Sequence, residues 1–318
     1  MTMRIVREWR GLSQDDRGAS IALGNFDGVH RGHQAVIGLA AAAARDQGLP
    51  LGVVSFEPHP RRIFQPDAPA FRLMKPEQLA RALDALGVDL LYLLPFDEVM
   101  RELSDQAFAE QVLHQGLGVR HVAVGFDISF GKGRSGSPAT MQAYGGALGF
   151  GVSVAEAVGE GGGDGESEGK FSSTEVRNAL REGRPELAAG ILGRPFAIEG
   201  EVRHGRQLGR TLGYPTANVE LDDYVAPRFG VYATRTRLSD GRTLAGVANI
   251  GVNPTVAGEI APRLEVWLFD FDEDLYGQVI ETDLIAFLRP EAKFASLEDM
   301  TAQIDDDASM ARMILSAG

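Results

Sequence analysis

One stretch near the N-terminus constrains the fold of this chain more than any other. Residues 21–23 form a short apolar run that ends at Gly24, and the turn that follows carries Gly28 and Gly32. Residues 34–47 are rich in alanine and favour a helix. The order predicts a buried strand, a glycine-rich turn and a helix. That arrangement presents backbone N–H groups and the positive end of a helix to a phosphate.

Two histidines lie where this turn enters the helix. His30 and His33 are three residues apart, so both side chains can point to one side of the first helical turn. Imidazole rings there can donate hydrogen bonds to phosphate oxygens. The alternative is that the two rings only cap or fill the turn. The accompanying Asn25, Asp27 and glycines favour a nucleotide site.

Strands and helices are expected to alternate through the first half of the chain. Such a pattern is typical of a doubly wound parallel sheet that helices cover on both faces. Ligands of these sheets bind beyond the carboxyl ends of the strands. Apolar strand segments occur at 51–56, 88–95, 120–125 and 151–157, and helical segments at 76–86 and 104–115.

The pattern changes near residue 186. From there the apolar runs are short and alternating, with turn signals at 222–223, 239–241 and 253–254, before a last helix expected at 296–307. This texture predicts an antiparallel β-barrel with a closing helix. A chain of 318 residues has room for about two domains. We therefore expect one domain at 1–186 and another at 187–318.

Composition limits the classes of partner. The chain has 31 Lys and Arg against 44 Asp and Glu, a net charge of −13, which argues against non-specific binding to nucleic acid or acidic membranes. It has no cysteine, so disulfides, thiolate metal sites and cysteine nucleophiles are excluded. No apolar run approaches the ~20 residues of a membrane helix, and residues 1–17 lack the apolar core of a signal peptide. The expected location is the cytoplasm.

Two more loops follow predicted strands. Residues 56–60 read FEPHP, and residues 124–136 read VGFDISFGKGRSG. Taken alone, the first is explained as a stiff turn and the second as a solvated glycine-rich connection.

A third candidate site follows the acidic, glycine-rich residues 159–169, whose charge has the wrong sign for a phosphate loop. Ser173, Thr174 and Arg177 offer two hydroxyls and a guanidinium at the start of a helix, an arrangement suited to a triphosphate. Helix capping by Ser172 or Ser173 explains the serines equally well.

The second half carries two further features. Residues 205–218, GRQLGRTLGYPTAN, combine glycines and arginines that can wrap a polyphosphate, although a long hairpin loop has the same composition. In the predicted strand 263–271, Glu265 falls on the same face as Trp267 and Phe269. A carboxylate among aromatic rings is suited to act as a general base for a hydroxyl, and a solvated edge position is the alternative.

Several of these motifs resemble one family. GNFDGVHRGH and the SST…R string are similar to the two signatures of HxGH nucleotidylyltransferases, in their details the FAD synthetase branch. FEPHP and the 124–136 loop resemble flavin-pocket elements of that branch. Three segments of the second half resemble flavokinase sequences: GRQLGRTLGYPTAN (205–218), ANIGVNPT (248–255) and DLYG (274–277). In order, from about residue 20 to about 307, the motifs resemble the bifunctional riboflavin kinase/FAD synthetases of bacteria.

The resemblance implies roles for individual residues. In the first domain it implies catalytic roles for His30, His33 and Arg177, and phosphate binding by Gly24, Phe26, Asp27, Gly28, Ser173 and Thr174. Flavin binding is implied for Phe56, Pro58, Asp127 and Phe130. In the second domain it implies phosphate binding by Gly209, Arg210 and Gly213, Mg²⁺ binding by Thr216 and Asn218, and general-base catalysis by Glu265. The chain departs from the family pattern at Ile128 and Ser129, where phenylalanine and arginine are common.

The implied function is a pair of ATP-dependent reactions. Riboflavin and ATP would give FMN and ADP, and FMN and ATP would then give FAD and diphosphate, with Mg²⁺ accompanying ATP. A flavin-binding sensor without turnover is one alternative, but it would lack some of His30, His33, Arg177, Thr216 and Glu265, all of which are present. An adenylyltransferase for another acceptor is a second alternative, and it would lack the PTAN segment and the Glu265 strand.

Overall fold

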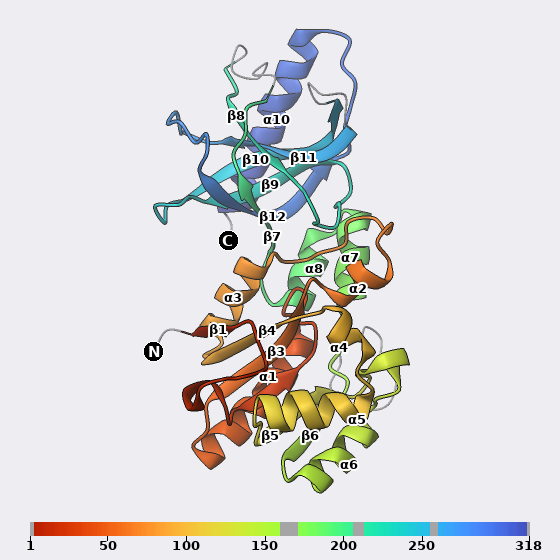
Figure 1. Cartoon of the computed structure of the whole chain (residues 1–318). Helices are drawn as coiled ribbons and strands as arrows, with labels where there is room; N and C mark the ends of the chain where they lie inside the picture. Colours follow the sequence, from red (N-terminus) through yellow and green to blue (C-terminus); the bar gives the residue numbers. More distant parts are fainter. Residues whose placement is uncertain (1–2, 160–170, 206–212, 255–259, 317–318) are drawn as a thin grey trace. The chain divides into compact units, whose positions relative to one another are not determined.

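The computed structural model describes residues 3–159, 171–205, 213–254 and 260–316. The chain forms two compact units (Figure 1). The first unit comprises Met1–Ala68 and Pro76–Ser172, and the second comprises Pro69–Lys75 and Ser173–Gly318. The domain boundary expected at residue 186 stays a prediction.

The first unit is built on a parallel sheet of six strands in the order β1-β4-β3-β2-β5-β6, and every neighbouring pair is parallel. The strands are β1 (Arg4–Val6), β2 (Ser20–Leu23), β3 (Leu51–Glu57), β4 (Leu90–Pro95), β5 (His121–Gly125) and β6 (Gly151–Ala155). The expected parallel sheet is confirmed. The short edge strand β1 was not expected, because its sequence is charged and carries no long apolar run.

The helices of this unit are α1 (Arg31–Gln47), α2 (Pro60–Phe64), α3 (Pro76–Ala85), α4 (Glu98–Glu102), α5 (Asp105–Ala107) and α6 (Pro138–Leu148). Two 3-10 helices, η1 (Gln14–Asp16) and η3 (Lys132–Arg134), and a π-helix, η2 (Phe108–Gly116), complete it. The helix expected at 104–115 begins as predicted, because the Ser104 hydroxyl accepts the N–H of Ala107. From Phe108 onward it winds as a π-helix, which residue pattern alone does not signal.

The sheet has its switch point between β2 and β5. β3 and β4 lie on one side of β2, and β5 and β6 lie on the other. Consequently the loop after β2 and the loop after β5 leave the same edge of the sheet from neighbouring strands. Binding sites of doubly wound sheets lie in the crevice between two such loops. Both loops carry motifs that the sequence singles out.

The second unit is an antiparallel sheet of six strands in the order β7-β12-β9-β10-β11-β8. The strands are β7 (Phe196–Glu201), β8 (Thr216–Glu220), β9 (Gly230–Arg237), β10 (Thr243–Pro254), β11 (Ile260–Leu268) and β12 (Val279–Arg289). A bridge between Arg203 and Asn218 joins the chain just after β7 to β8. This contact connects the two edges of the sheet and curls it into the expected barrel.

The helices of the second unit are α7 (Ser173–Glu182), α8 (Pro185–Leu192) and α10 (Leu297–Ser316). Apolar residues of α10 pack on β9 and β10 in one buried cluster, made up of Val231, Ala233, Val247, Phe269, Ala308, Ala311 and Leu315. The expected closing helix is therefore present and runs beyond residue 307. Within the described ranges, no helix combines the length and apolarity needed to cross a membrane.

Two turn predictions have different outcomes. The turn at 239–241 is confirmed, since the N–H of Leu238 bonds to the carbonyl of Arg242 and Gly241 has φ +90°. The turn at 253–254 is wrong, because Asn253 and Pro254 still pair with β11. A proline is tolerated at the end of a strand, where it interrupts few ladder bonds.

Residues Pro69–Lys75 pack with the second unit although they precede it in sequence. The N–H groups of Phe71 and Arg72 both donate to the carbonyl of Asp223, at 3.1 and 2.8 Å, and the Arg72 carbonyl accepts from Val225. Phe71 is 1% exposed. Loss of this segment would therefore leave part of the second unit's core uncovered.

Candidate active sites

The loop after β2 has a strained backbone. Phe26, Gly28 and Val29 have φ of +52°, +90° and +44°, a region that only glycine adopts without cost. The Phe26 ring lies over Gly24, where an added Cβ would approach the ring to 3.3 Å. Strain of this kind persists where the surrounding structure holds it, and it is concentrated at functional sites.

His30 and His33 lie together at the start of α1, as their spacing predicts. His30 is the N-cap, and its Nδ1 accepts the backbone N–H of His33 at 3.2 Å. The proton of the neutral His30 ring is therefore on Nε2, which leaves that atom as a donor. The two rings stack with centroids 3.6 Å apart, and Phe26 meets His33 edge to face at 5.1 Å.

The loop after β2 also contacts the segment that leads to the 172–177 motif. A Cβ on Gly32 would lie 3.0 Å from the Phe171 carbonyl oxygen, so the two segments are in close contact at this position. Phe171 is buried, and its N–H donates to the Val158 carbonyl at 2.9 Å. Phe171 directly precedes the serines of the 172–177 motif in the sequence.

Ser173, Thr174 and Arg177 occupy the first turns of α7, as expected. Their helix belongs to the second unit. Arg177 is 8% exposed, and its Nε donates to the Phe71 carbonyl at 2.7 Å. The guanidinium also lies 5.6 Å from the centre of the Phe71 ring. The contact from residue 71 to Arg177 was not predicted, because nothing in the local sequence links the two.

The phenylalanines implied in flavin binding share one aromatic cluster. Phe56, at the end of β3, and Phe130, in the loop after β5, both contact the buried ring of Phe108, with centroids 6.2 and 5.9 Å away. Phe96 meets Phe56 at 5.7 Å, and the largely exposed Phe64 meets Phe96 at the same distance. Phe64, Phe96 and Phe108 are not among the residues that the sequence motifs include. Phe96 directly follows a predicted strand, which was the available signal.

The other two residues implied in flavin binding, Pro58 and Asp127, lie in loops that follow strands. Pro58 lies between β3 and α2. Asp127 is exposed in the turn after β5, where the Ile128 N–H bonds to the Gly125 carbonyl. The two departures from the family pattern have structural explanations. Ile128 packs on the core of the first unit, and the Ser129 hydroxyl accepts from Arg134 Nε at 2.9 Å.

In the second unit, strands β8, β10 and β11 bring the implied kinase residues together. Glu265 pairs with Asn218 on one side and with Asn249 on the other, and Trp267 pairs with Thr216. Register partners project to the same face. The opposite face of β11 is fully buried at Leu264 and Val266. The expected alternation along this strand is confirmed.

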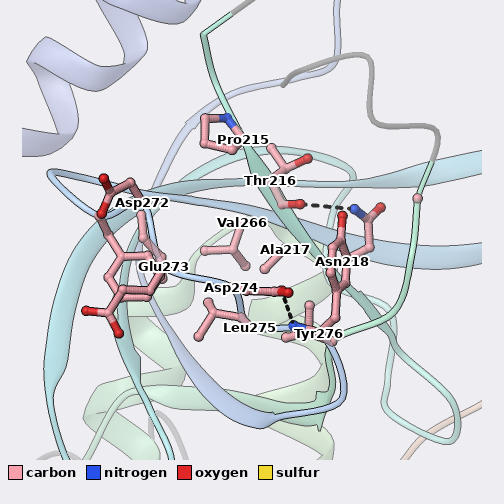
Figure 2. A pocket seen from close by; sticks show the side chains of 14 residues that line it. Pro215, Thr216, Ala217, Asn218, Val266, Asp272, Glu273, Asp274, Leu275 and Tyr276 are labelled. Atoms are coloured by element: carbon pink, nitrogen blue, oxygen red, sulfur yellow. Dashed lines mark hydrogen bonds between the residues drawn. The ribbon is translucent and has the colours of Figure 1, made fainter. Parts of the chain in front are cut away.

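Thr216 and Asn218 line a cavity of about 300 Å³, shown in Figure 2. Asn218 Nδ2 donates to the Thr216 carbonyl at 3.3 Å. The opposite wall is the segment after β11, which contributes Asp272, Glu273, Asp274, Leu275 and Tyr276. The His204 ring lies 3.7 Å from the Tyr276 ring.

Glu265 lines a second cavity of about 300 Å³ with Trp267, Tyr214 and Thr216. Thr216 therefore lies on the wall of both cavities. The lining of the second cavity also includes Arg289 and Asp307. Arg289 Nη2 donates to Asp307 Oδ2 at 2.7 Å, and Nε donates to Oδ1 at 2.9 Å.

Ion pairs hold the acidic wall of the first cavity. Arg242 donates to both oxygens of Glu273, at 2.7 and 2.8 Å, and this bonding keeps the pKa of Glu273 below its ordinary value. Arg312 lowers the pKa of Asp270 in the same way. The segment that follows β11 is thus anchored at both Asp270 and Glu273.

Gly209, Arg210 and Gly213 are the remaining residues for which the resemblance implies phosphate binding. Gly209 and Arg210 lie outside the described residues. Gly213 has φ +90°, so its backbone conformation favours glycine.

Comparisons with known proteins agree with this two-part arrangement. The family model for FAD synthetase matches residues 12–169, and the model for riboflavin kinase matches residues 192–315. A bifunctional riboflavin kinase/FMN adenylyltransferase of Pseudomonas fluorescens is 43% identical over 313 residues, covering 98% of each chain. The enzyme of that name from Escherichia coli strain K12 is 42% identical and covers 98% of this chain and 97% of its own.

A more distant relative and a solved structure extend the comparison. The Bacillus subtilis protein of the same name is 38% identical over 96% of this chain and 95% of its own. A crystal structure titled as a macrolide-efflux protein from Streptococcus pneumoniae has a TM-score of 0.84 and 29% identity, covering 98% of this chain and 99% of that one. The chain belongs to the bifunctional riboflavin kinase/FMN adenylyltransferase family.

Proposed function

We propose that the second unit phosphorylates riboflavin and that the first unit adenylylates the resulting FMN. The observation that carries the kinase assignment is the position of Thr216 on the walls of two adjoining cavities. One cavity contains Asn218 and suits Mg·ATP, and the other contains Glu265 and suits the flavin.

In the kinase reaction Glu265 acts as the general base. The 5′-hydroxyl of riboflavin is a poor nucleophile until its proton has an acceptor. The oxygen attacks the γ-phosphorus of ATP, the bond to the bridging oxygen breaks, and ADP leaves. Trp267 and Tyr214, whose rings meet edge to face at 4.8 Å, form an apolar wall for the flavin ring.

The first cavity has the donors that Mg²⁺ prefers. The Thr216 hydroxyl and the Asn218 amide are hard oxygen ligands on one strand. Mg²⁺ usually keeps several waters and takes few protein ligands beside the substrate phosphates, so no large carboxylate cluster is required. Thr216 and Asn218 would hold the Mg·ATP substrate, whose metal neutralises charge on the phosphates. Gly205 gives Asn218 its space, since an added Cβ would lie 2.6 Å from the amide nitrogen.

The adenylyl transfer needs no protein nucleophile. A phosphate oxygen of FMN attacks the α-phosphorus of ATP, and diphosphate leaves. His30 and His33 stabilise the charge that develops at that phosphorus. The strained loop that contains Gly24, Phe26, Asp27 and Gly28 orients backbone groups for the same phosphates.

Ser173, Thr174 and Arg177 are proposed to bind the β- and γ-phosphates. Their place in the first turns of α7 supports this role, since a helix N-terminus favours anions. Phe56 and Phe130, with Pro58 and Asp127 beside them, are proposed to receive the flavin ring. Both phenylalanines contact Phe108, which supports a common aromatic wall.

The partners we propose are small molecules only: riboflavin, FMN and ATP, and neither nucleic acid nor membrane. The cytoplasm remains our expectation for the location, because ATP is available there.

Chromatography of a single reaction tests the proposal. The full chain, incubated with riboflavin, ATP and Mg²⁺, should convert riboflavin first to FMN and then to FAD, and added EDTA should stop both steps. Accumulation of FMN without FAD would contradict the adenylyltransferase assignment. Failure to consume riboflavin, with FMN still converted to FAD, would contradict the kinase assignment.

A further inference from the structure

The loop after β5, residues 125–136, is tied to a segment of chain that none of the motifs includes. The Lys132 N–H donates to the Leu103 carbonyl at 2.7 Å, and the Lys132 ammonium pairs with the Glu102 carboxylate. The Ser135 hydroxyl donates to Asp105 Oδ1 at 2.8 Å. Residues 102–105 therefore form the surface against which this loop rests.

Asp105 is at the centre of these contacts. Its second oxygen, Oδ2, accepts the hydroxyl of Tyr144 at 2.8 Å, so one carboxylate holds both the loop and helix α6. These two hydroxyl donors also keep the pKa of Asp105 below its ordinary value, so the group is charged at neutral pH. Hydrogen bonds to a charged acceptor are about twice as strong as neutral ones.

The loop is shaped for this close approach. Gly131 has φ +74°, and a Cβ there would lie 2.4 Å from the Asp105 backbone nitrogen. Phe130 and Gly136 pair through two backbone hydrogen bonds, and a Cβ on Gly136 would lie 2.7 Å from the Phe130 ring. The position of the Phe130 ring thus follows from where Gly131 and Ser135 are held.

We propose that Asp105 is a positioning residue for FMN in the adenylyl transfer reaction: it docks the 125–136 loop and thereby holds Phe130 against Phe108. The proposal rests on the proposed function, in which Phe130 contacts the flavin ring. Asp105 touches neither substrate. It acts through Ser135 and Tyr144, because both of its carboxylate oxygens are engaged with them.

The test is steady-state kinetics of FMN adenylylation by full-length variants, with riboflavin kinase activity of the same samples as a control for folding. Asp105→Ala should raise the KM for FMN by about ten- to a hundredfold, the equivalent of losing hydrogen bonds to a charged group. The KM for ATP and the kinase rate should stay near wild type. Asp105→Asn keeps one acceptor oxygen, so its KM for FMN should lie between those of the wild type and Asp105→Ala.

A matched control separates positioning from general stability. Asp89 accepts the N–H of Leu51 at 2.9 Å, just before β4 begins and away from the carboxyl edge of the sheet. Asp89→Ala removes a comparable carboxylate contact of the same unit and should leave the KM for FMN unchanged. If Asp105→Ala fails to fold, the double variant Ser135→Ala with Tyr144→Phe removes the same bonds and keeps the charge.

Double-mutant cycles supply the last criterion. As a single variant, Ser135→Ala should raise the KM for FMN. In the Asp105→Ala background the same substitution should raise that KM little further. An unchanged KM for FMN in Asp105→Ala, with wild-type turnover, would overturn the proposal. So would equal increases in the KM for FMN and for ATP. Absence of FMN adenylylation in the wild-type chain is a different result, which would overturn the proposed function instead.

Discussion

At the scale of single residues, Glu265 carries the sharpest functional prediction. It shares a face with Trp267 and pairs in register with Asn218. Glu265→Gln keeps the shape and removes the basicity, so the kcat for FMN formation should fall by about 100- to 10,000-fold. The affinities for ATP and riboflavin should change little. Thr216→Ala is the comparison, and it should weaken Mg·ATP binding as well.

Single-turnover measurement of FMN formation checks this prediction. A wild-type rate in Glu265→Gln would show that another group is the base. Conversion of supplied FMN to FAD serves as the control, and it should be normal in both variants because that reaction belongs to the other site.

Gly205 offers a second test at this scale. A Cβ at this position would lie 2.6 Å from Asn218 Nδ2, so Gly205→Ala should displace the amide and raise the KM for Mg·ATP in the kinase reaction. Gly190→Ala in α8 is the matched control, since nothing lies within 4 Å of its added Cβ. It should leave kinetics unchanged and favour the helix slightly. Equal KM values for the two variants would contradict the proposed role of Asn218.

At the scale of elements, a buried histidine links the strands at the start of the parallel sheet. Ser20 in β2 donates to the Ala40 carbonyl at 2.8 Å, so its oxygen accepts from His121 Nδ1 at 3.1 Å. His121 Nε2 then accepts from Ser153 in β6 at 2.9 Å. Burial lowers the pKa of His121 below its ordinary value.

The lowered pKa predicts a pH-dependent stability for the first unit. In the unfolded chain His121 takes up a proton near its ordinary pKa, whereas in the fold it does so only at lower pH. The stabilisation is therefore complete above about pH 6.5 and is lost as the pH falls toward the folded pKa. Between neutral and mildly acidic pH, the His121→Asn variant should lose less unfolding free energy than the chain that retains His121.

Urea unfolding can follow this unit alone. The chain has two tryptophans, Trp9 and Trp267, and they belong to different units. In a Trp267→Phe background, the fluorescence of Trp9 reports the first unit. If the His121→Asn variant and the chain that retains His121 showed identical pH dependence of the unfolding free energy, that result would contradict the account.

The elements also show which parts of the fold can be predicted from the sequence. Strongly apolar strands such as β3 and β4, and helices that begin at a proline such as α3, follow from local pattern. The short strand β1 and the π-helical winding from Phe108 do not, because tertiary packing decides them. The candidate sites divide in the same way. His30, His33 and Glu265 are recognisable by spacing, whereas Phe108 and Asp105 become relevant only through long-range contacts.

At the scale of the whole molecule, the extent of the kinase unit is testable. The sequence predicts a boundary at residue 186, but α7 packs with the second unit, where the Leu180 carbonyl accepts from the Arg228 N–H at 2.9 Å. Val176 and Leu180 are at most 1% exposed. Burial of two such side chains contributes a few kcal/mol, about 1.5–3 kcal/mol each. A 173–318 fragment should therefore be more stable than a 187–318 fragment.

Unfolding of the two fragments, followed by Trp267 fluorescence, measures the difference. Both fragments lack residues 69–75, so the comparison isolates residues 173–186. Equal unfolding midpoints and equal kinase activity would favour the boundary at residue 186.

The central claim is that one chain has two separable active sites joined only by diffusible FMN. Chromatography of riboflavin reactions with two inactivated variants tests it most directly. The double variant His30→Ala with His33→Ala should stop at FMN, since each charge-stabilising donor contributes about 3–4 kcal/mol to the transition state. Glu265→Gln should leave riboflavin nearly unconverted yet turn supplied FMN into FAD. Mixing the two proteins should restore FAD synthesis from riboflavin. FAD made from riboflavin by either variant alone at the wild-type rate, or a mixture that makes no FAD, would contradict the claim.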